Sequence, residues 1–330
     1  MDMSESVTFA VFADLHVDIM HDSIARVQAV IGAAKQKGAQ FLVHLGDLTY
    51  PEEEFMRERF GKTQSDMDPI AFRCTRNEEK REVMRLLREC GLPVWHTLGN
   101  HECDAGTKEM AEAYFGMSAP FYSFDCGGFH FVVLDANFMQ EDGRILDYEN
   151  TNYQHHPRAV MPVLPQEQIR WLEEDVIRSG KPTVVFSHQS LTDTQLGIRN
   201  HEEFQAALDR LNAHEKRVLL CANGHAHIDG VRRHGGVYFW DVNSISNIWI
   251  GMRYACVRYS EAIDRDYPYL KGTAPYRDPL YAIVTLTPER AVIEGTRSEF
   301  AGPSPYDLGF PLSGSEYPST AEIQSRTLVF

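Results

Sequence analysis

Near its N-terminus the chain reads Val7-Thr8-Phe9-Ala10-Val11-Phe12-Ala13-Asp14-Leu15-His16. Residues 7–12 are mostly apolar and rich in β-branched and aromatic side chains, so they are predicted to form a buried strand. Asp14 and His16 follow this strand two residues apart, and on an extended segment that spacing points both side chains the same way. The stretch therefore predicts a strand that delivers a carboxylate and an imidazole to one edge of a sheet.

The same arrangement recurs along the first third of the chain. The predicted elements are a helix over 23–37, a strand over 41–45 that ends at Gly46-Asp47, a helix over 78–90, and a strand over 93–98 that ends at Gly99-Asn100. This alternation of strand and helix predicts a parallel sheet. Ligands bind outside the carboxyl ends of such strands, which is where the polar motifs fall.

The rest of the chain continues the pattern with longer interruptions. Strands are expected over 129–134, 183–186, 218–221 and 237–240, a helix over 166–179, and a hairpin over 280–287 and 291–296. Two polar segments, 51–77 and 139–162, are either lids over the site or solvated surface loops. We expect one domain over residues 1–300 and an extended C-terminal tail over 301–330, which is rich in Pro, Ser and Gly.

Five short motifs contain the side chains that a two-metal centre needs. They are Asp14-Leu15-His16, Gly46-Asp47, Gly99-Asn100-His101-Glu102, Ser187-His188 and Gly224-His225-Ala226-His227. Each motif alone is weak evidence, because such dipeptides are common in loops. Together they offer carboxylate, amide and imidazole ligands for two neighbouring divalent cations, and one histidine remains for proton transfer.

The order and spacing of these motifs resemble the calcineurin-like metallophosphoesterase superfamily, which includes purple acid phosphatases and class III cyclic-nucleotide phosphodiesterases. The resemblance runs from about Phe9 to Asp241. It implies an α/β fold, the four-layer α/β/β/α sandwich of two sheets flanked by helices, with the metal site at one edge. It also implies metal-dependent hydrolysis of phosphate esters, with manganese, iron or zinc as the two metal ions.

Two adjacent cations need a shared carboxylate to offset their mutual repulsion, and Asp47 at the end of a central strand is the candidate. The resemblance implies the remaining ligands. They are Asp14, His16 and His227 for the first metal, and Asn100, His188 and His225 for the second. Gly46, Gly99 and Gly224 are expected to let the backbone turn sharply beside the ions.

The resemblance gives His101 a catalytic role, in which it protonates the leaving group while a metal-activated hydroxide attacks phosphorus. Glu102 is expected behind the ligands, where it orients His101 or a ligand histidine. Residues Gly46 to Tyr50 match the G-D-x-x-Y pattern of purple acid phosphatases, in which the tyrosine binds ferric iron. Those enzymes lack the equivalent of His16, so Tyr50 is redundant here, and packing or support of a ligand is the favoured role.

The composition limits the partners and the compartment. A chain of 330 residues with 43% hydrophobic content can bury a large core, and its formal charge of −15 argues against binding long nucleic acids. No apolar stretch is long enough to span a membrane, and no secretory signal precedes the first strand. Six scattered cysteines predict reduced thiols and a cytoplasmic protein.

Three functions remain open from the sequence. The first is a phosphodiesterase or phosphatase that acts on a small soluble, nucleotide-like substrate. The second is a nucleotide pyrophosphatase, which would need a surface for base stacking; the candidate side chains are Tyr50, Trp95, Trp249 and Tyr254. The third is a non-catalytic scaffold of the same fold that binds metal or phosphate without turnover.

Overall fold

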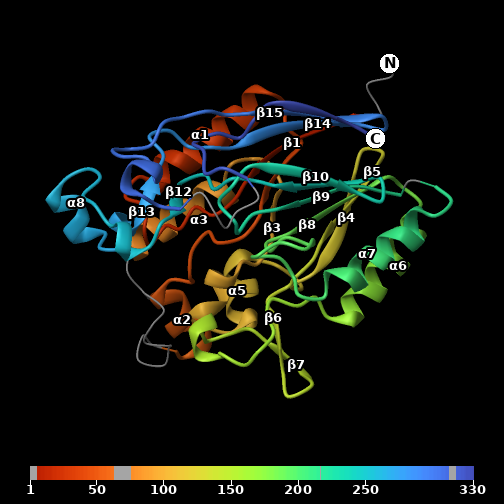
Figure 1. Ribbon diagram of the computed structural model, residues 1–330, viewed down its shortest axis with the longest axis horizontal. Coiled ribbons are helices and arrows are strands. Elements are labelled where there is room, and N and C mark those ends of the chain that lie inside the picture. Colours follow the sequence, from red (N-terminus) through yellow and green to blue (C-terminus); the bar gives the residue numbers. More distant parts are fainter. Residues whose placement is uncertain (1–5, 63–75, 216, 312–316) are drawn as a thin grey trace.

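The computed structural model describes residues 6–62, 76–215, 217–311 and 317–330, and two six-stranded sheets form its centre (Figure 1). The strands of the two sheets are β1 (Val7–Phe12), β2 (Phe41–His44), β3 (Val94–His96), β4 (Tyr122–Cys126), β5 (Phe129–Val133), β8 (Thr183–Ser187), β9 (Val218–Asn223), β10 (Gly230–His234), β11 (Val237–Asp241), β14 (Ala282–Thr287), β15 (Arg290–Gly295) and β16 (Arg326–Val329). Sheet A has the order β16-β15-β14-β1-β2-β3, and sheet B has the order β10-β11-β9-β8-β5-β4.

The helices connect and cover these sheets. They are α1 (Ser23–Gln36), α2 (Glu53–Phe60), α3 (Asn77–Arg88), α4 (Asn100–Asp104), α5 (Lys108–Phe115), α6 (Gln166–Ser179), α7 (His201–Asn212) and α8 (Glu261–Asp266). Two small antiparallel sheets pair β6 (Phe138–Glu141) with β7 (Arg144–Asp147) and β12 (Asn247–Trp249) with β13 (Thr273–Pro275). Short 3-10 turns occupy Tyr153–His155, Met252–Tyr254, Leu270–Gly272 and Tyr306–Leu308.

The predicted parallel sheet is confirmed for the first three strands, because β1 pairs parallel with β2, and β2 pairs parallel with β3. The hairpin β14–β15 extends this sheet on its other side, where β14 runs antiparallel to β1. In sheet B, β5, β8, β9 and β11 are also parallel neighbours. The carboxyl ends of the parallel strands therefore gather on one side of each sheet.

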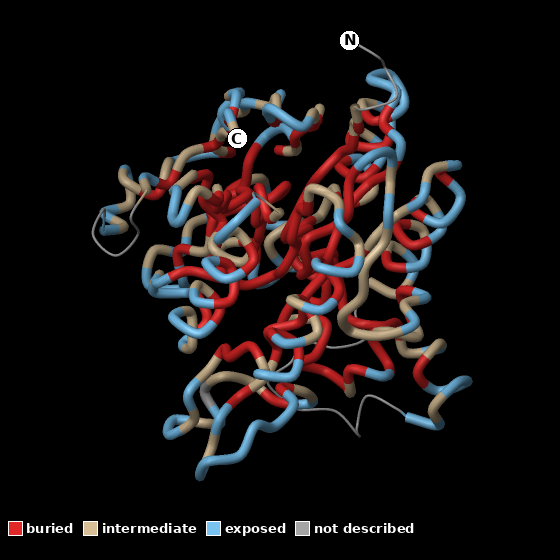
Figure 2. The backbone as a smooth tube through the Cα atoms, turned by 90° about the vertical axis from the view of Figure 1, so that its right-hand side faces the viewer, coloured by how far each residue is buried: buried red, intermediate tan, exposed pale blue. Residues whose placement is uncertain are grey.

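Alternation along the strands explains the layers. Phe9 of β1 points between the sheets, where its ring lies 5.9 Å from the rings of both Phe131 and Phe186 in sheet B. Phe12 points the opposite way and packs in the cluster that includes Val27 of α1. Helices α6 and α7 cover the outer face of sheet B (Figure 1). The expected four-layer α/β/β/α sandwich is confirmed, and the buried backbone is concentrated in its two central layers (Figure 2).

The two segments expected as lids have different structures. Helix α2 lies in the first, of which residues 63–75 are outside the described part of the chain. The second contains the β6–β7 hairpin and a 3-10 turn. The segment expected as an extended tail supplies β16, the edge strand of sheet A, and buries Ile323. A domain boundary near residue 300 stays a prediction.

Among the described residues, no helix is long and apolar enough to cross a membrane. Five of the cysteines are free thiols: Cys90, Cys103, Cys126, Cys221 and Cys256. Cys74 lies outside the described residues.

Candidate metal centre

The seven predicted ligands lie where strands of both sheets end. Asp14 and His16 follow β1, Asp47 follows β2, and Asn100 begins α4 after β3. From sheet B, His188 follows β8, and His225 and His227 follow β9. Six of them fall into two groups whose ligand atoms all lie within 4.8 Å of one another, namely Asp14, His16 and His227, and Asp47, His188 and His225. A third group of the same kind joins His16, Asp47 and His101.

The first group brings two imidazole nitrogens and a carboxylate oxygen close together. His227 uses Nδ1 to donate to the carbonyl oxygen of Asn247, so its Nε2 carries a lone pair. That Nε2 lies 3.2 Å from Nε2 of His16 and 3.4 Å from Oδ1 of Asp14. Either a proton on Nε2 of His16 or a bound cation can lie between these atoms, and a cation could be held by all three of them.

The second group shows the same pattern. His188 Nδ1 donates to the carbonyl oxygen of Leu45 at 2.7 Å, which again leaves a lone pair on Nε2. This Nε2 lies 3.1 Å from Nδ1 of His225, 3.3 Å from Oδ1 of Asn100 and 3.2 Å from Oδ2 of Asp47. Nitrogen and oxygen acceptors thus surround one point from several directions.

Asp47 lies between the two groups. Its Oδ2 is 3.2 Å from Nε2 of His188 and 3.9 Å from Nε2 of His16. Its Oδ1 accepts a hydrogen bond from the backbone N–H of His101 at 2.9 Å, which fixes the orientation of the carboxylate. A buried carboxylate between two sets of imidazoles has the position that a bridging ligand requires.

The electrostatics of the pocket favour bound positive charge. Burial lowers the pKa of His225 to about 3, so this imidazole is neutral and its lone pair is available. Burial alone would favour the neutral acid at Asp47, but the imidazoles of His188 and His101 hold the pKa of Asp47 well below its usual value. Burial also opposes charge on His188, yet Asp47 raises the pKa of His188 to about 9, so a proton occupies its Nε2 unless a cation takes that place. The residues present therefore fit two cations.

The backbone beside the centre is strained. Eight described residues other than glycine have positive φ, and five of them are predicted ligands: Asp14, His16, Asp47, His225 and His227, with φ of 56°, 52°, 58°, 68° and 51°. Left-handed backbone costs a non-glycine residue on the order of 1–3 kcal/mol, and such strain concentrates at functional sites. The prediction that Asp14 and His16 share one side of an extended segment is wrong, because both residues form left-handed turns.

All three motif glycines are required by close packing, and a Cβ on Gly224 would lie 2.7 Å from Oδ2 of Asp14. A Cβ on Gly99 would lie 2.1 Å from Oδ1 of Asp47, and a Cβ on Gly46 would lie 2.4 Å from Nδ1 of His188. Gly46 also has φ of +94°, which disfavours any side chain. All three glycines therefore allow the backbone to approach the ligand side chains directly.

His101 lies on α4 at the edge of the centre. Its Nδ1 is 3.1 Å from the hydroxyl of Tyr50 and 3.1 Å from Oδ2 of Asp104, and its Nε2 is 4.0 Å from Oδ2 of Asp47. Partners on Nδ1 leave Nε2 to face the centre. Tyr50 thus contacts His101 in the structure, which agrees with a supporting role for its hydroxyl. Sequence reasoning missed Asp104, although its position three residues after His101 on a helix was a usable signal.

Glu102 has a different task from the expected one. Its carboxylate accepts hydrogen bonds from the backbone N–H groups of Asp47 at 2.9 Å, Leu48 at 2.5 Å and Gly99 at 2.7 Å. We expected it to orient a histidine. Instead it ties the loop that carries Asp47 to the start of α4, so it positions a ligand through the backbone.

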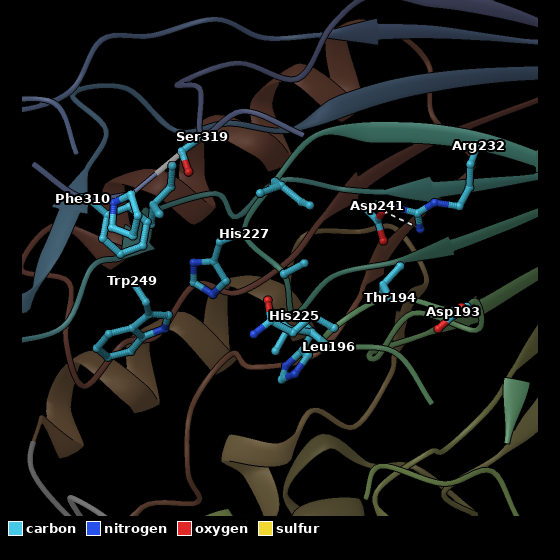
Figure 3. A pocket seen from close by; sticks show the side chains of 15 residues that line it. Asp193, Thr194, Leu196, His225, His227, Arg232, Asp241, Trp249, Phe310 and Ser319 are labelled. Carbon is cyan, nitrogen blue, oxygen red and sulfur yellow. Dashed lines mark ion pairs between the residues drawn. The ribbon is translucent and has the colours of Figure 1, made fainter. Parts of the chain in front are cut away.

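A cavity of about 550 Å³ opens beside the two histidines of the last motif (Figure 3). Its walls come from four parts of the chain: Asp193, Thr194, Gln195 and Leu196; His225, Ala226, His227, Ile228, Arg232 and Asp241; Ile248 and Trp249; and Phe310, Pro311 and Ser319. Trp249 was one of four aromatic candidates in the sequence; the contribution of the C-terminal segment was not anticipated.

One protein-family model matches most of the chain, and solved structures are similar to it in fold. The model of the calcineurin-like phosphoesterase family matches residues 7–229, a range that contains all seven predicted ligands. The fold is similar to that of a dimetal phosphatase from Danio rerio, with a TM-score of 0.58 and 18% identity over 89% of this chain and 98% of that one. It is also similar to GAP50, the anchor in the inner membrane complex of Plasmodium, with a TM-score of 0.48 and 11% identity over 97% of this chain and 90% of that one. The comparison with curated proteins gave no match.

Proposed function

Because the chain belongs to the calcineurin-like phosphoesterase family, we propose that it is a dinuclear metal-dependent hydrolase of small soluble phosphate esters, nucleotide-like in size. The observation that carries this proposal is the convergence of imidazole and carboxylate atoms on both sides of Asp47, with the amide oxygen of Asn100 on the side of His188. Such a set suits two transition-metal ions, and manganese, iron and zinc are the candidates.

We assign the first metal to Asp14, His16 and His227, and the second to Asn100, His188 and His225, with Asp47 shared. When bound, the two ions would supply Lewis acidity and make water a nucleophile at neutral pH. The protein contributes the ligand geometry. The hydrogen bonds from His227 to Asn247 and from His188 to Leu45 fix the orientation of each imidazole ring and place a proton on its Nδ1.

We assign to His101 the transfer of a proton from Nε2 to the leaving oxygen of the ester. Tyr50 and Asp104 hold its Nδ1, so the ring orientation is set before substrate binds. Asp47 adds a further constraint, because its Oδ1 accepts from the backbone N–H of His101. The Asp47 carboxylate therefore fixes the position of His101 relative to the metal ligands.

The net charge of −15 supports a small substrate over a nucleic-acid polymer, because an acidic exterior repels a long polyanion while bound cations attract a single phosphate. We retain a reducing, cytoplasmic setting as part of the proposal, on the ground that the described cysteines are free.

The test is hydrolysis of bis-p-nitrophenyl phosphate and p-nitrophenyl phosphate by protein loaded with Mn²⁺. Faster cleavage of the diester would identify a phosphodiesterase, and faster cleavage of the monoester a phosphatase. Stoichiometric metal without turnover of either ester would contradict the proposal and indicate a binding protein of the same fold.

A further inference from the structure

Trp249 forms one wall of the candidate metal centre. It is the last residue of β12, the short strand in which the carbonyl oxygen of Asn247 accepts from His227. The centroid of its ring lies 5.6 Å from that of His16, nearly perpendicular at 79°, and 6.4 Å from that of His101, nearly parallel at 19°. Because β12 anchors a ligand histidine, the position of the indole is coupled to that of the centre.

The cavity beside Trp249 has an apolar, aromatic side. Ile228 and Ile248 contribute buried aliphatic surface, and Phe310 lies on the same side of the cavity as Trp249 in Figure 3. Phe310 is supported from behind by Tyr254, whose ring meets it edge-on with centroids 5.4 Å apart. Trp249 and Phe310 are both partly exposed, so their rings can contact a ligand.

The opposite side of the cavity offers little net positive charge. Among the described lining residues, Arg232 is the one Arg or Lys, and its guanidinium lies 3.0 Å from Oδ2 of Asp241. The same guanidinium donates to the hydroxyl of Thr192 at 2.9 Å. Asp193 adds an exposed carboxylate. A second phosphate placed here would find the charge of Arg232 already neutralised by Asp241, whereas an uncharged ring could pack against the apolar side.

We propose that this cavity binds the heteroaromatic group of the substrate, a ring of nucleobase size, stacked against Trp249 with Phe310 at the outer rim. The inference rests on the proposed function, since the phosphate must lie at the metal centre for the ring to reach this wall. Of the other aromatic candidates in the sequence, Trp95 is stacked on Phe124 at 3.9 Å in the core, and Tyr50 is buried against His101.

The test compares two ligands that differ in the base. Adenosine 5′-monophosphate and ribose 5-phosphate are measured as competitive inhibitors of bis-p-nitrophenyl phosphate hydrolysis by the Mn²⁺-loaded protein. Base stacking on an aromatic side chain is expected to make the nucleotide bind about 10-fold more tightly or better. In Trp249→Ala the ratio of the two inhibition constants should fall to about 2-fold or less. Trp249→Phe, which keeps an aromatic face, should retain most of the ratio.

Controls separate stacking from damage to the centre. Metal content is measured for each variant, and Tyr269→Ala, on an exposed ring outside the cavity, should leave the ratio unchanged. Equal constants for the two ligands in the unmodified protein, or an unchanged ratio in Trp249→Ala, would overturn the inference. If the protein does not hydrolyse the diester, dissociation constants from calorimetry replace the inhibition constants. The stacking proposal is then tested independently of the proposed reaction.

Discussion

The chemistry of the centre depends on how a few side chains are oriented by their second contacts. His227 and His188 each donate one ring N–H to a backbone carbonyl, and both turn a lone pair toward the centre. His101 is oriented by side chains instead of a backbone carbonyl, because Tyr50 and Asp104 contact its Nδ1. At this scale the residues that converge at the centre could be predicted from the sequence, because the motifs specify residue types. The role of Asp104 and the carbonyl partners of the histidines could not be predicted. Any residue supplies a backbone carbonyl, and a single aspartate is compatible with many roles.

His101→Ala should keep both metals and lose most turnover. General acids contribute about 10²- to 10⁴-fold, so kcat for an alkyl ester should fall by that amount, and the loss should be smaller for a p-nitrophenyl leaving group that needs no proton. The measurement is kcat for both esters together with metal content. His234→Ala, at an exposed site on β10, is the matched control. Full activity of His101→Ala toward an alkyl ester would refute the assigned role.

Elements deliver these side chains to one place through tight connections. Strands β1, β2 and β3 and helices α1 and α3 were predictable because each has a clear period, and the predicted helix 166–179 coincides with α6. Helices α4, α5, α7 and α8 were missed. Helix α4 has only five residues, too few for periodicity to reveal, and it forms where Glu102 accepts the N–H groups of Gly99 and of the neighbouring loop. The left-handed turns at the ligands were also missed, because tertiary contacts impose them.

Glu102→Gln should loosen the connection between the loop after β2 and α4. An amide has one acceptor oxygen, and its NH₂ group would face backbone donors that now meet a carboxylate. We expect the free energy of unfolding to fall by about 2–4 kcal/mol, together with weaker metal retention. Urea denaturation provides the measurement, with Glu109→Gln on the exposed face of α5 as the control. Equal midpoints for the two variants would count against the connecting role.

For the whole molecule, the centre joins the two sheets. Asp14, His16 and Asp47 come from sheet A, and His188, His225 and His227 come from sheet B, so a bound cation would link both halves of the sandwich. The sequence predicted this architecture through the family resemblance. It did not predict that residues 326–329 complete sheet A, because an edge strand is defined by its partner β15 and carries a weak local pattern.

Removal of metal should therefore destabilise the entire fold. Metal that binds only the native state stabilises it by about 2.7 kcal/mol per site at 100 times Kd, so chelation should lower Tm by about 5 °C or more. Added Mn²⁺ should restore Tm at neutral pH and fail to do so at acidic pH, where protons occupy the imidazole lone pairs. Scanning calorimetry with and without chelator decides this; identical Tm values would argue against ligands contributed by both sheets.

The central claim is that Asp47 is shared by two metal ions. The most direct measurement is elemental analysis of the purified protein after Mn²⁺ loading and desalting, compared with Asp47→Asn treated identically. The account predicts two metal ions per chain in the unmodified protein and a clear loss in Asp47→Asn, because the amide keeps the shape of the carboxylate but loses the charge that offsets two cations. Full retention of two metals by Asp47→Asn, or a single metal in the unmodified protein, would contradict it.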